Sequence, residues 1–503
     1  MPGRRGEVRR ALSFGAILLC YAWFVHFWPT FHAANESIRF YFVSAVVDHG
    51  TVQVDQVMER YKVGNVDRAE FGGHAYMDKA PGLSFAVMPV YWALTSAGMS
   101  TDRSEVWRLW YWLLLIGVSL PCVFGIWCTW DVVRDWTGDE RAAATAAIVL
   151  GMATPYAVYA TLFFGHGPAA ALAVMSFWAL RRRWLVLAGL LAGGMVLVDT
   201  ATAFMAVILG VYAGLRHRSL DDMIRFGMGG IPGVAGQLAY NTWCFGEPLT
   251  FAYSYKASAD LAAIHEQGVY GFIIPGWEPL WGLTFGGHRG LLYHAPVLLL
   301  AAAAIKKGGS RDGWLLAAAS GLYFLWIACF VDWPAGAAYA PRHLVPITPF
   351  LAIGVGLAVA RYPRLVWAAA PLALASAVVA WSAIATFPYA PLALDVPFTQ
   401  QAWAMVSEGE LAGTLWGLPA WGVLVPAGVA VGVWRPRPQV VLASLAGVGL
   451  VVGMVWLGPA GGTEIVESRI SVECLTDYVA EAKGRCEGGG GEFNELRCRC
   501  SFE

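Results

Sequence analysis

Two short stretches near the N-terminus contain the residues best suited to chemistry. Asn35 and Glu36 open the run NESIRFYFVSAVVDHG, and Arg39 follows three residues after Glu36. Asp78 and Lys79 lie further along, in GGHAYMDKAPG. A carboxylate at a membrane face can accept a proton from a reacting group, and a nearby cation can bind a phosphate and stabilise charge that develops on it. These residue types therefore indicate acid–base chemistry combined with anion binding.

Each of these residues also has a purely structural interpretation. Asn35 is placed to cap a helix over residues 36–48, with Glu36 in its positively polarised first turn, and Gly50 is expected to end this helix. Such a charge at a helix end contributes under about 1 kcal/mol. Asp78 and Lys79 would, on the same view, only anchor the chain to lipid headgroups. The residue types alone leave the structural and the functional interpretations open.

Three more polar residues interrupt apolar segments later in the chain. His166 lies in FFGHGPAAALA, where a single histidine is more often a structural hydrogen-bonding residue than a catalytic one. Asp199 lies in VLVDTATAF, and an acidic residue near a membrane is costly enough to be a functional candidate. Arg342 lies in AAYAPRHLVP, where a polar loop returns to apolar sequence. The topology derived below places all three on the same side as Glu36 and Lys79.

The composition indicates the kind of scaffold that must position these residues. The chain has 503 residues, of which 57% are hydrophobic and 14% charged, with a formal net charge of −1. Apolar runs approach the roughly 20 residues that cross a bilayer as a helix. They are continuous rather than alternating, which excludes a transmembrane barrel. We therefore predict an all-α polytopic membrane protein, and the absence of a basic tail argues against a nucleic-acid partner.

Thirteen transmembrane helices are predicted within a domain of residues 1–458, and a tail of residues 459–503 follows. The first apolar stretch comes after a basic N-terminus and lacks a clear cleavage site, so we expect a retained signal anchor rather than a signal peptide. The predicted spans are 11–31, 107–131, 142–161, 167–180, 184–198, 200–215, 226–245, 290–305, 313–331, 344–360, 365–386, 416–434 and 440–458.

Basic residues set the orientation, because short cytoplasmic loops are enriched in Lys and Arg. With residues 81–98 lying in the outer interface instead of crossing, nineteen of the 34 basic residues fall on one side. This places the N-terminus in the cytoplasm, the protein in the inner membrane, and the tail outside. The loops expected outside are 32–106, with interfacial helices, 246–289, 332–343 and 387–415.

Four of the nine cysteines are crowded into the tail, at Cys474, Cys486, Cys498 and Cys500. An exported segment lies in an oxidising compartment, which favours disulfides. Three pairings are possible, and the sequence does not choose among them. A zinc site is the alternative, but the tail contains no histidine and the cysteine spacing fits no common zinc pattern.

The chain resembles the GT-C superfamily of membrane glycosyltransferases, whose members include the protein O-mannosyltransferases and the bacterial aminoarabinose transferases of lipid A. The motifs that carry the resemblance are NE..R at residues 35–39, DKAPG at 78–82, LWGLTFGGHRGLLYHAP at 280–296 and PRHLVP at 341–346. The resemblance covers most of residues 10–360. It does not extend to the last 140 residues or to the cysteine tail.

This resemblance implies a GT-C fold and an inverting transfer of a sugar from a polyprenyl-phosphate-linked donor on the outer, periplasmic face. By position, Glu36 is the implied base, with Asp78 as the other catalytic candidate. The implied substrate-binding residues are Asn35, Arg39, Lys79, His166, Asp199 and Arg342, with Lys79 and Arg342 as ligands of the lipid phosphate.

Two positions depart from the family pattern. Better-known members have an Asp–Glu pair where this chain has Asn35–Glu36, and several have a basic residue where it has Asp199. The first departure leaves three outcomes: Glu36 takes over as base, another carboxylate such as Asp78 does so, or activity is lost.

The partners implied are the lipid-linked sugar donor, membrane lipids, and a glycan, lipid or protein acceptor. No protein cofactor is implied with certainty; a divalent metal is permitted by the acidic loop, although no ligand spacing demands one. One rival function is a flippase or transporter of lipid-linked sugars, which would place ionisable residues along the middle of the spans. A binding scaffold with a degenerate GT-C fold is the second rival, and Asn35 and the unusual tail keep it open.

Overall fold

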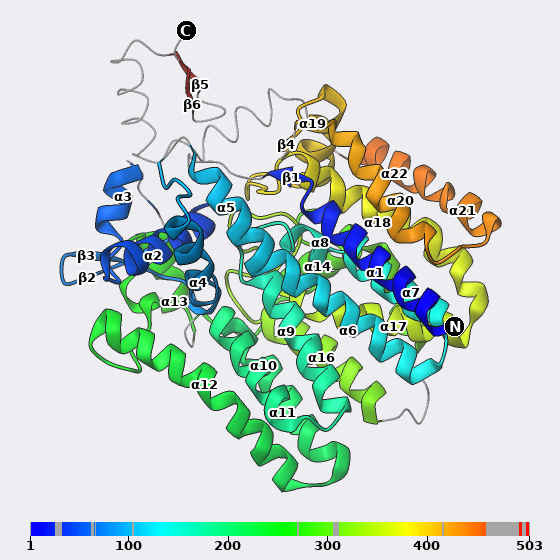
Figure 1. The fold of residues 1–503 in the computed structure, drawn as a ribbon, viewed down its shortest axis with the longest axis horizontal. Coiled ribbons are helices and arrows are strands. Elements are labelled where there is room, and N and C mark those ends of the chain that lie inside the picture. Colours follow the sequence, from blue (N-terminus) through cyan, green and yellow to red (C-terminus); the bar gives the residue numbers. More distant parts are fainter. Residues whose placement is uncertain are drawn as a thin grey trace.

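The structure is a computed structural model that describes residues 2–25, 33–61, 65, 67–102, 105–268, 271–304, 311–414, 417–458, 492–494 and 499–501. Helices dominate it (Figure 1). The α-helices are α1 Pro2–Tyr21, α2 Ala34–His49, α3 Asp55–Tyr61, α4 Gly82–Ser96, α5 Val106–Leu114, α6 Leu120–Thr137, α7 Glu140–Met152, α8 Pro155–Tyr159, α9 His166–Arg181, α10 Leu185–Val198, α11 Ala203–His217, α12 Leu220–Phe245, α13 Ala259–Glu266, α14 Trp277–Thr284, α15 Leu291–His294, α16 Arg311–Ala328, α17 Thr348–Arg361, α18 Val366–Ala385, α19 Trp403–Glu408, α20 Leu424–Gly432, α21 Pro438–Ser444 and α22 Ala446–Leu457.

Short helical turns and strands complete the described chain. The 3-10 helices are η2 Thr200–Thr202, η3 Ala252–Tyr255, η4 Pro296–Ala304, η5 Arg342–Ile347, η6 Pro363–Leu365 and η8 Ala420–Val423, and the π-helical turns are η1 Leu115–Ser119 and η7 Phe398–Ala402. Three antiparallel strand pairs are formed by β1 Phe24–Val25 with β4 Gly413–Thr414, β2 Arg68–Phe71 with β3 His74–Met77, and β5 Glu492–Asn494 with β6 Arg499–Ser501.

Helices occupy each predicted span, with some changes of boundary. The first begins at Pro2 and ends at Tyr21, earlier than the expected end at residue 31, because the chain then forms β1. The span predicted at 142–161 is divided between α7 and α8, where Thr154 accepts a hydrogen bond from the amide of Tyr156 and starts a new helix.

Four stretches of the described chain are long and apolar enough to cross a membrane: Val106–Thr137, Arg342–Arg361, Pro363–Ala385 and Pro438–Leu457. The protein is therefore a multi-pass membrane protein, and the count of thirteen crossings stays a prediction.

Helices α10 and α12 pack with their backbones almost in contact. A Cβ atom added to Gly189 would lie 1.8 Å from the carbonyl oxygen of Phe226, and one added to Gly233 would lie 2.2 Å from that of Gly193. Small residues allow this close approach, which is typical of helix pairs in membrane proteins. Val198 is the last residue of α10, and Asp199 follows it directly.

The loop expected at 32–106 contains more regular structure than two interfacial helices. Helix α2 ends at His49, with Gly50 in the left-handed conformation at a φ of 66°, as the sequence predicts. Between α2 and α4, however, α3 and a hairpin of β2 and β3 replace the expected polar loop. Gly72 and Gly73 form the two-residue turn with φ values of 60° and 84°, the conformation that such hairpins favour.

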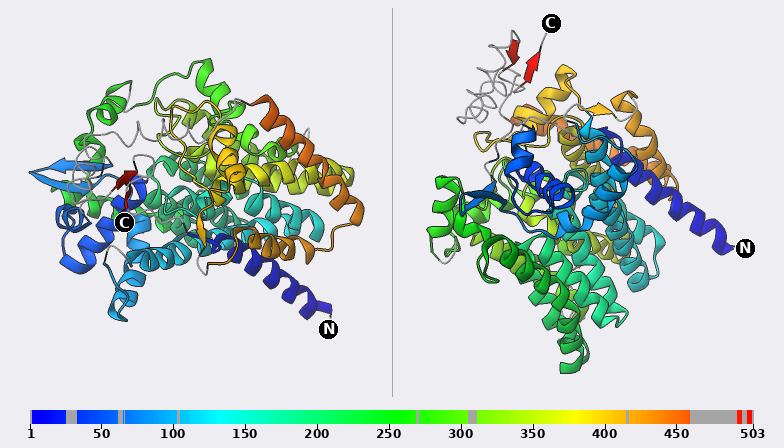
Figure 2. Two further views of the ribbon diagram at one scale, coloured as in Figure 1. Left: turned by 90° about the horizontal axis from the view of Figure 1, so that it is seen from above. Right: turned by 60° about the vertical axis from the view of Figure 1, so that its left-hand side comes forward.

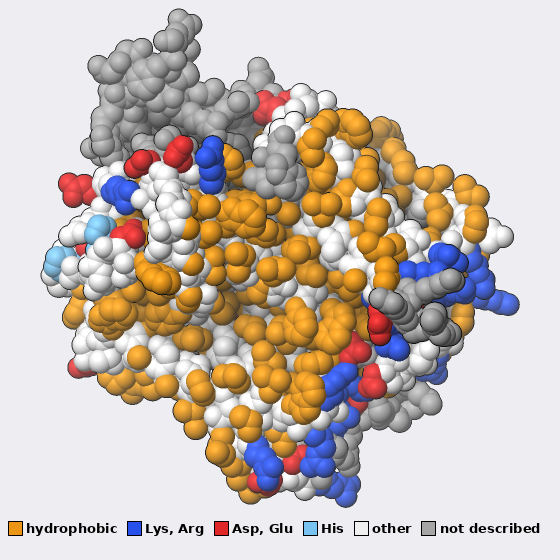
Figure 3. Space-filling view, in the orientation of Figure 1, with side chains coloured by type: hydrophobic (Ala, Val, Ile, Leu, Met, Phe, Trp, Pro, Cys, Tyr) orange, Lys and Arg blue, Asp and Glu red, His pale blue; other side chains and the backbone are white. Residues whose placement is uncertain are grey.

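Charged side chains collect at two ends of the molecule. We call the end that carries α2, α3, α4 and the β2–β3 hairpin the hairpin end; the end that carries Arg181, Arg182 and Arg216 is the arginine end. The hairpin projects away from the start of α1 (Figure 2). In Figure 3 a broad hydrophobic surface separates charged groups at the left from those at the lower right. This pattern suits a molecule whose middle lies in lipid.

Candidate functional site

The first turn of α2 connects two elements of the hairpin end. The helix begins at Ala34, so the residue that caps it is Ala33, and the prediction of Asn35 as the cap is wrong. The Asn35 side chain instead accepts a hydrogen bond of 3.2 Å from Nε of Arg39, one turn further along. Nη1 of Arg39 donates to the carbonyl of Ala80 at 2.8 Å. Arg39 is buried, and its burial lowers the pKa of its guanidinium.

Glu36 joins three segments that lie far apart in the sequence. Its side chain is 3% exposed. One carboxylate oxygen accepts a hydrogen bond from the Phe163 amide, and the other accepts one of 2.6 Å from the Tyr389 hydroxyl. Burial raises the pKa of Glu36 to about 7, although both hydrogen bonds and the charge of Arg39 favour the ionised form. Glu36 therefore titrates close to neutral pH.

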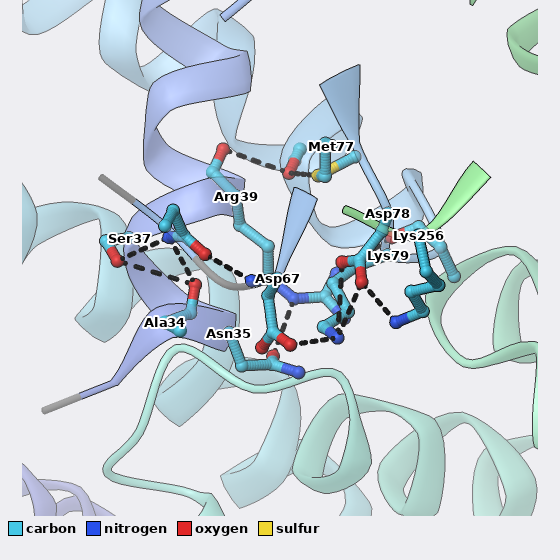
Figure 4. A network of polar contacts seen from close by, with 12 residues as sticks. Ala34, Asn35, Ser37, Arg39, Asp67, Met77, Asp78, Lys79 and Lys256 are labelled. Atoms are coloured by element: carbon cyan, nitrogen blue, oxygen red, sulfur yellow. Dashed lines mark hydrogen bonds and ion pairs between the residues drawn. The ribbon is translucent and has the colours of Figure 1, made fainter. Parts of the chain in front are cut away.

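Two lysines and two aspartates form a compact network beside Arg39 (Figure 4). Nζ of Lys79 lies 3.0 Å from Asp67 and 3.2 Å from Asp78. Asp78 also contacts Nζ of Lys256, which comes from the segment between α12 and α13. The side chains of Asp78 and Lys256 are buried, whereas those of Asp67 and Lys79 are 17% and 13% exposed. The network therefore opens toward solvent on the side of Asp67 and Lys79.

The pKa shifts in this network follow from burial and from the neighbouring charges. Burial alone would lower the pKa of Lys79, but Asp67 and Asp78 outweigh it and raise this pKa. The pKa of Lys256 is lowered, first by burial and then by the charge of Lys79. Burial would raise the pKa of Asp67, but the nearby lysines hold it below its usual value. Lys79 thus remains cationic at physiological pH.

His166 and Asp199 form a second polar pair next to this network. Nδ1 of His166 lies 2.7 Å from Oδ2 of Asp199, which also caps η2 through the Ala201 amide. Burial would raise the pKa of Asp199, but pairing with His166 lowers it to about 2. The pKa of His166 is lowered by burial despite that pairing. An imidazole oriented by a carboxylate is suited to hydrogen bonding and to proton transfer.

Arg342 lies at the start of η5 on the same side of the site. Its guanidinium stacks over the Phe164 ring at 5.8 Å from the centroid, and its buried Nε makes no hydrogen bond among the described residues. The neighbouring His343 packs edge-on against His166 at 5.3 Å between ring centroids. The charge of Arg342 lowers the pKa values of both Asp67 and His166. All eight predicted catalytic and substrate-binding residues therefore lie in one connected region.

Several members of this region were not among the residues predicted from the sequence, namely Asp67, Tyr253, Lys256, Asp332 and Tyr389. Lys256 had a usable signal, because it and Arg289 are the only two basic residues in the predicted outer loop 246–289. Tyr253 packs against Lys256, with its ring centroid 5.2 Å from Nζ. Tyr389 offered no local signal, because its role depends on a contact with Glu36 across 353 positions of sequence.

Two further predictions concern a metal ion and the cysteines of the tail. Within the part of the chain that the structure describes, no group of three or more His, Cys, Asp or Glu side chains is arranged to hold a metal ion. Cys474, Cys486 and Cys498 lie outside the described residues, and Cys500 belongs to β6. The tail disulfides therefore stay a prediction.

Comparisons with known proteins identify the fold. No model of a protein family matches the chain, and no curated protein matches its sequence. The solved structure of ArnT, an aminoarabinose transferase from Cupriavidus metallidurans, bound to undecaprenyl phosphate superposes with a TM-score of 0.51 and 17% identity, over 96% of this chain and 80% of that one. Its apo state gives 0.47 and 18% over 93% and 80%.

The archaeal oligosaccharyltransferase AglB from Archaeoglobus fulgidus, solved with an inhibitory peptide and a dolichol-phosphate, gives a TM-score of 0.40 and 12% identity. That match covers 95% of this chain and 59% of the archaeal protein. The superposition on lipid-bound ArnT shows that the chain has the GT-C fold, which confirms the fold expected from the sequence motifs.

Proposed function

We propose that the protein is an inverting GT-C glycosyltransferase that moves a sugar from a polyprenyl-phosphate-linked donor to an acceptor at the periplasmic face of the inner membrane. The observation that carries this proposal is the presence at the hairpin end of two guanidiniums, those of Arg39 and Arg342, whose described contacts are with neutral groups. Arg39 is held by an amide oxygen and a carbonyl, both neutral. Arg342 stacks on an aromatic ring and has a buried Nε without a hydrogen bond among the described residues.

A phosphate would supply the missing anionic partner. Lys79 is partly exposed and remains cationic, so it can approach a phosphate oxygen without leaving Asp67. Arg342 lies close enough for its charge to act on Asp67, the partner of Lys79, so it can donate to the same group. Hydrogen bonds to charged groups contribute about 1.5–3 kcal/mol each, more than those between neutral groups. The solved lipid-bound ArnT, which has the same fold, contains undecaprenyl phosphate.

In the proposed reaction, the bond between the anomeric carbon and the phosphate oxygen breaks while an acceptor oxygen or nitrogen attacks the opposite face of that carbon. The departing polyprenyl phosphate takes the bonding electrons, and Lys79, with Arg39 or Arg342, stabilises its charge. The proton of the acceptor passes to a carboxylate. No step requires a metal ion.

Glu36 is the proposed base, because its pKa of about 7 suits proton transfer at neutral pH. Each of its oxygens accepts one hydrogen bond and keeps a second lone pair for the acceptor. Asp67 is the competing candidate, because it is the more exposed carboxylate, although Lys79 lowers its proton affinity. Asp78 fits the role of base less well, since it is buried between two ammonium groups.

The rival function of a flippase is less well supported by the charge distribution. A path for a charged headgroup would place ionisable groups along the middle of the helices. The ion pairs of the described chain instead gather at the two ends, as Figure 3 illustrates for one face. A scaffold role has no observation in its favour beyond Asn35 and the unusual cysteine tail.

Purified protein in nanodiscs, incubated with undecaprenyl-phosphate-linked hexoses and pentoses and with extracted envelope lipids, tests the proposal through release of undecaprenyl phosphate. We expect release by the wild type, little by Glu36→Gln, and near-normal release by Asp67→Asn. The opposite order of the two variants would make Asp67 the base. The matched control is Arg225→Ala, which removes an exposed cation paired with Asp221 far from the site.

Failure to release undecaprenyl phosphate from any donor would contradict the proposal. Movement of a fluorescent undecaprenyl-phosphate sugar between vesicle leaflets in the same preparation would then favour the flippase. Binding of the donor with neither release nor movement would favour a scaffold.

A further inference from the structure

The segment between Asp332 and Arg342 has an unfavourable backbone. Ala335 and Ala340 have φ values of 66° and 59°, in the left-handed region that residues with a Cβ atom rarely adopt. Both alanines are buried. Non-glycine residues persist in this conformation only where their surroundings hold them there, and such positions are concentrated at functional sites.

Arg289 holds the first of these two positions. Its side chain is 0% exposed, and it donates hydrogen bonds of 2.6 Å to the carbonyl of Pro334 and 2.7 Å to that of Gly336. These two carbonyls flank Ala335 in the sequence. The planar guanidinium presents several donors in a fixed geometry, so one side chain can fix both peptide groups at once.

Different residues hold the second position. The Tyr159 hydroxyl donates to the carbonyl of Tyr339 at 2.8 Å, and the Ala338 amide donates to the carbonyl of Ala390 at 3.1 Å. Ala335 and Ala340 are therefore two comparable left-handed positions that different hydrogen bonds hold.

The two ends of this segment face the charged network of the site. Burial raises the pKa of Asp332, and the charges of Arg342, Lys79 and Lys256 partly offset that rise. The Asp332 carboxylate also accepts a hydrogen bond of 3.2 Å from the Ala335 amide. A change of conformation at Ala335 would therefore move Asp332 directly and alter the path of the chain to Arg342.

We propose that Arg289 is a positioning residue that holds Ala335 in its left-handed conformation and so fixes Asp332 and Arg342 for the lipid phosphate. This inference rests on the proposed glycosyl transfer for its catalytic consequence. It assigns a role to the HRG motif at residues 288–290, which the chemistry of the site itself does not use. Arg289 acts through backbone geometry and does not contact the substrate.

The test compares Arg289→Lys alone with the double variant that also contains Ala335→Gly. The matched control is the double variant that contains Arg289→Lys and Ala340→Gly. Lysine lacks the fork that reaches two carbonyls, and a shift of about 1 Å in a positioning group can reduce activity about 100-fold. Glycine adopts a positive φ without strain. We therefore expect Arg289→Lys to lower kcat/KM about 100-fold, and Ala335→Gly to restore most of that loss in the double variant. Ala340→Gly should restore none of it.

Three activity results would overturn the proposal: wild-type kcat/KM in Arg289→Lys, equal restoration by Ala335→Gly and Ala340→Gly, or restoration by neither. A purely structural role would also predict no restoration by either glycine. If Arg289→Lys accumulates in membranes only together with Ala335→Gly, this is the same rescue at the level of folding. If neither Arg289→Lys nor its combination with Ala335→Gly accumulates in membranes, Arg289 has a general folding role and the proposal is rejected.

Thermal unfolding separates this inference from the proposed function. The midpoint of unfolding should fall in Arg289→Lys and recover with Ala335→Gly but not with Ala340→Gly, whether or not the wild type transfers sugar. If the wild type releases no undecaprenyl phosphate but shows this thermal pattern, the glycosyl transfer is rejected and the role of Arg289 in holding Ala335 is retained. If the wild type transfers sugar but neither the thermal pattern nor the restoration of activity is observed, only the role of Arg289 in holding Ala335 is rejected.

Discussion

Arginines at the two charged ends of the molecule have different kinds of partner. At the arginine end, Arg181 pairs with Asp135 and Asp312, and Arg216 shares Asp312. At the hairpin end, Arg39 is held by an amide and a carbonyl, and Arg342 by an aromatic ring. Matched charges tie helices together and leave little attraction for another anion. Guanidiniums held by neutral groups keep that attraction, so the difference distinguishes a structural network from the candidate binding site.

The largest effect is expected when the hairpin end loses a cation. Lys79→Ala should reduce release of undecaprenyl phosphate about 100- to 1,000-fold, the range seen when one group that stabilises developing charge is removed. Lys79→Arg should keep part of the activity, because it retains the charge. The measurement is kcat/KM in nanodiscs with the thermal midpoint beside it. A loss of activity explained by unfolding would place Lys79 with the structural network.

The arginine end should respond through stability. Asp312→Ala would leave Arg181 and Arg216 without their shared carboxylate and remove the 2.6 Å hydrogen bond from Tyr212. Breaking a buried ion pair on one side costs about 3 kcal/mol, and the partial exposure of this network reduces that figure. We expect a lower thermal midpoint with unchanged kcat of the folded protein. A loss of kcat at constant stability would break the distinction between the two ends.

Tyr389→Phe tests whether the Tyr389 hydrogen bond helps to set the pKa of Glu36. The Tyr389 hydrogen bond favours the ionised form of Glu36. Its loss should therefore raise the pKa of Glu36 from about 7 to a higher value. A base must be deprotonated, so the activity of the wild type should rise with pH through neutrality, and the variant should reach its plateau at a higher pH. A hydrogen bond to a charge contributes about 1.5–3 kcal/mol, so activity at pH 7 should fall about tenfold. An unchanged pH profile would argue against Glu36 as the base.

The smallest effect is expected from the exposed pair Arg225–Asp221, one turn apart on α12. Such pairs contribute about 0.3–0.5 kcal/mol, so Arg225→Ala should change the thermal midpoint by little and activity by nothing measurable. High salt should weaken this pair further without affecting the wild-type site. A larger loss of activity would show that charge at the arginine end also serves catalysis.

The sequence predicted features that depend on local pattern. Gly50 ended α2 where expected, and the apolar segment at 81–98 became the separate helix α4. The hairpin was not predicted, although Gly72–Gly73 is a turn signal, because its two strands are only 4 residues long each. Asn35 fits the usual preference for capping residues, yet Arg39 competes for its side chain and the helix starts earlier.

The parts of the site that sequence could not provide are all contacts between distant segments. Lys256 reaches Asp78 because residues 256 and 257 pair with the hairpin, through the bridge of Ala69 to Lys256 and the hydrogen bond from the Ala257 amide to Arg68. Nothing in the local sequence fixes that pairing. The fold decides which of several plausible charges meet.

The hydrogen bond between Glu36 and Tyr389 also orders events during biogenesis. The two residues are separated by 353 positions, and at about 5–20 residues per second synthesis takes roughly 20 to 70 s to pass from one to the other. During that interval α2 and the hairpin are already made, while the Glu36 carboxylate still lacks its hydroxyl donor. The nascent protein therefore passes through a stage in which most of its helices exist but its candidate base is incomplete, and chains truncated before residue 389 would be inserted yet inactive.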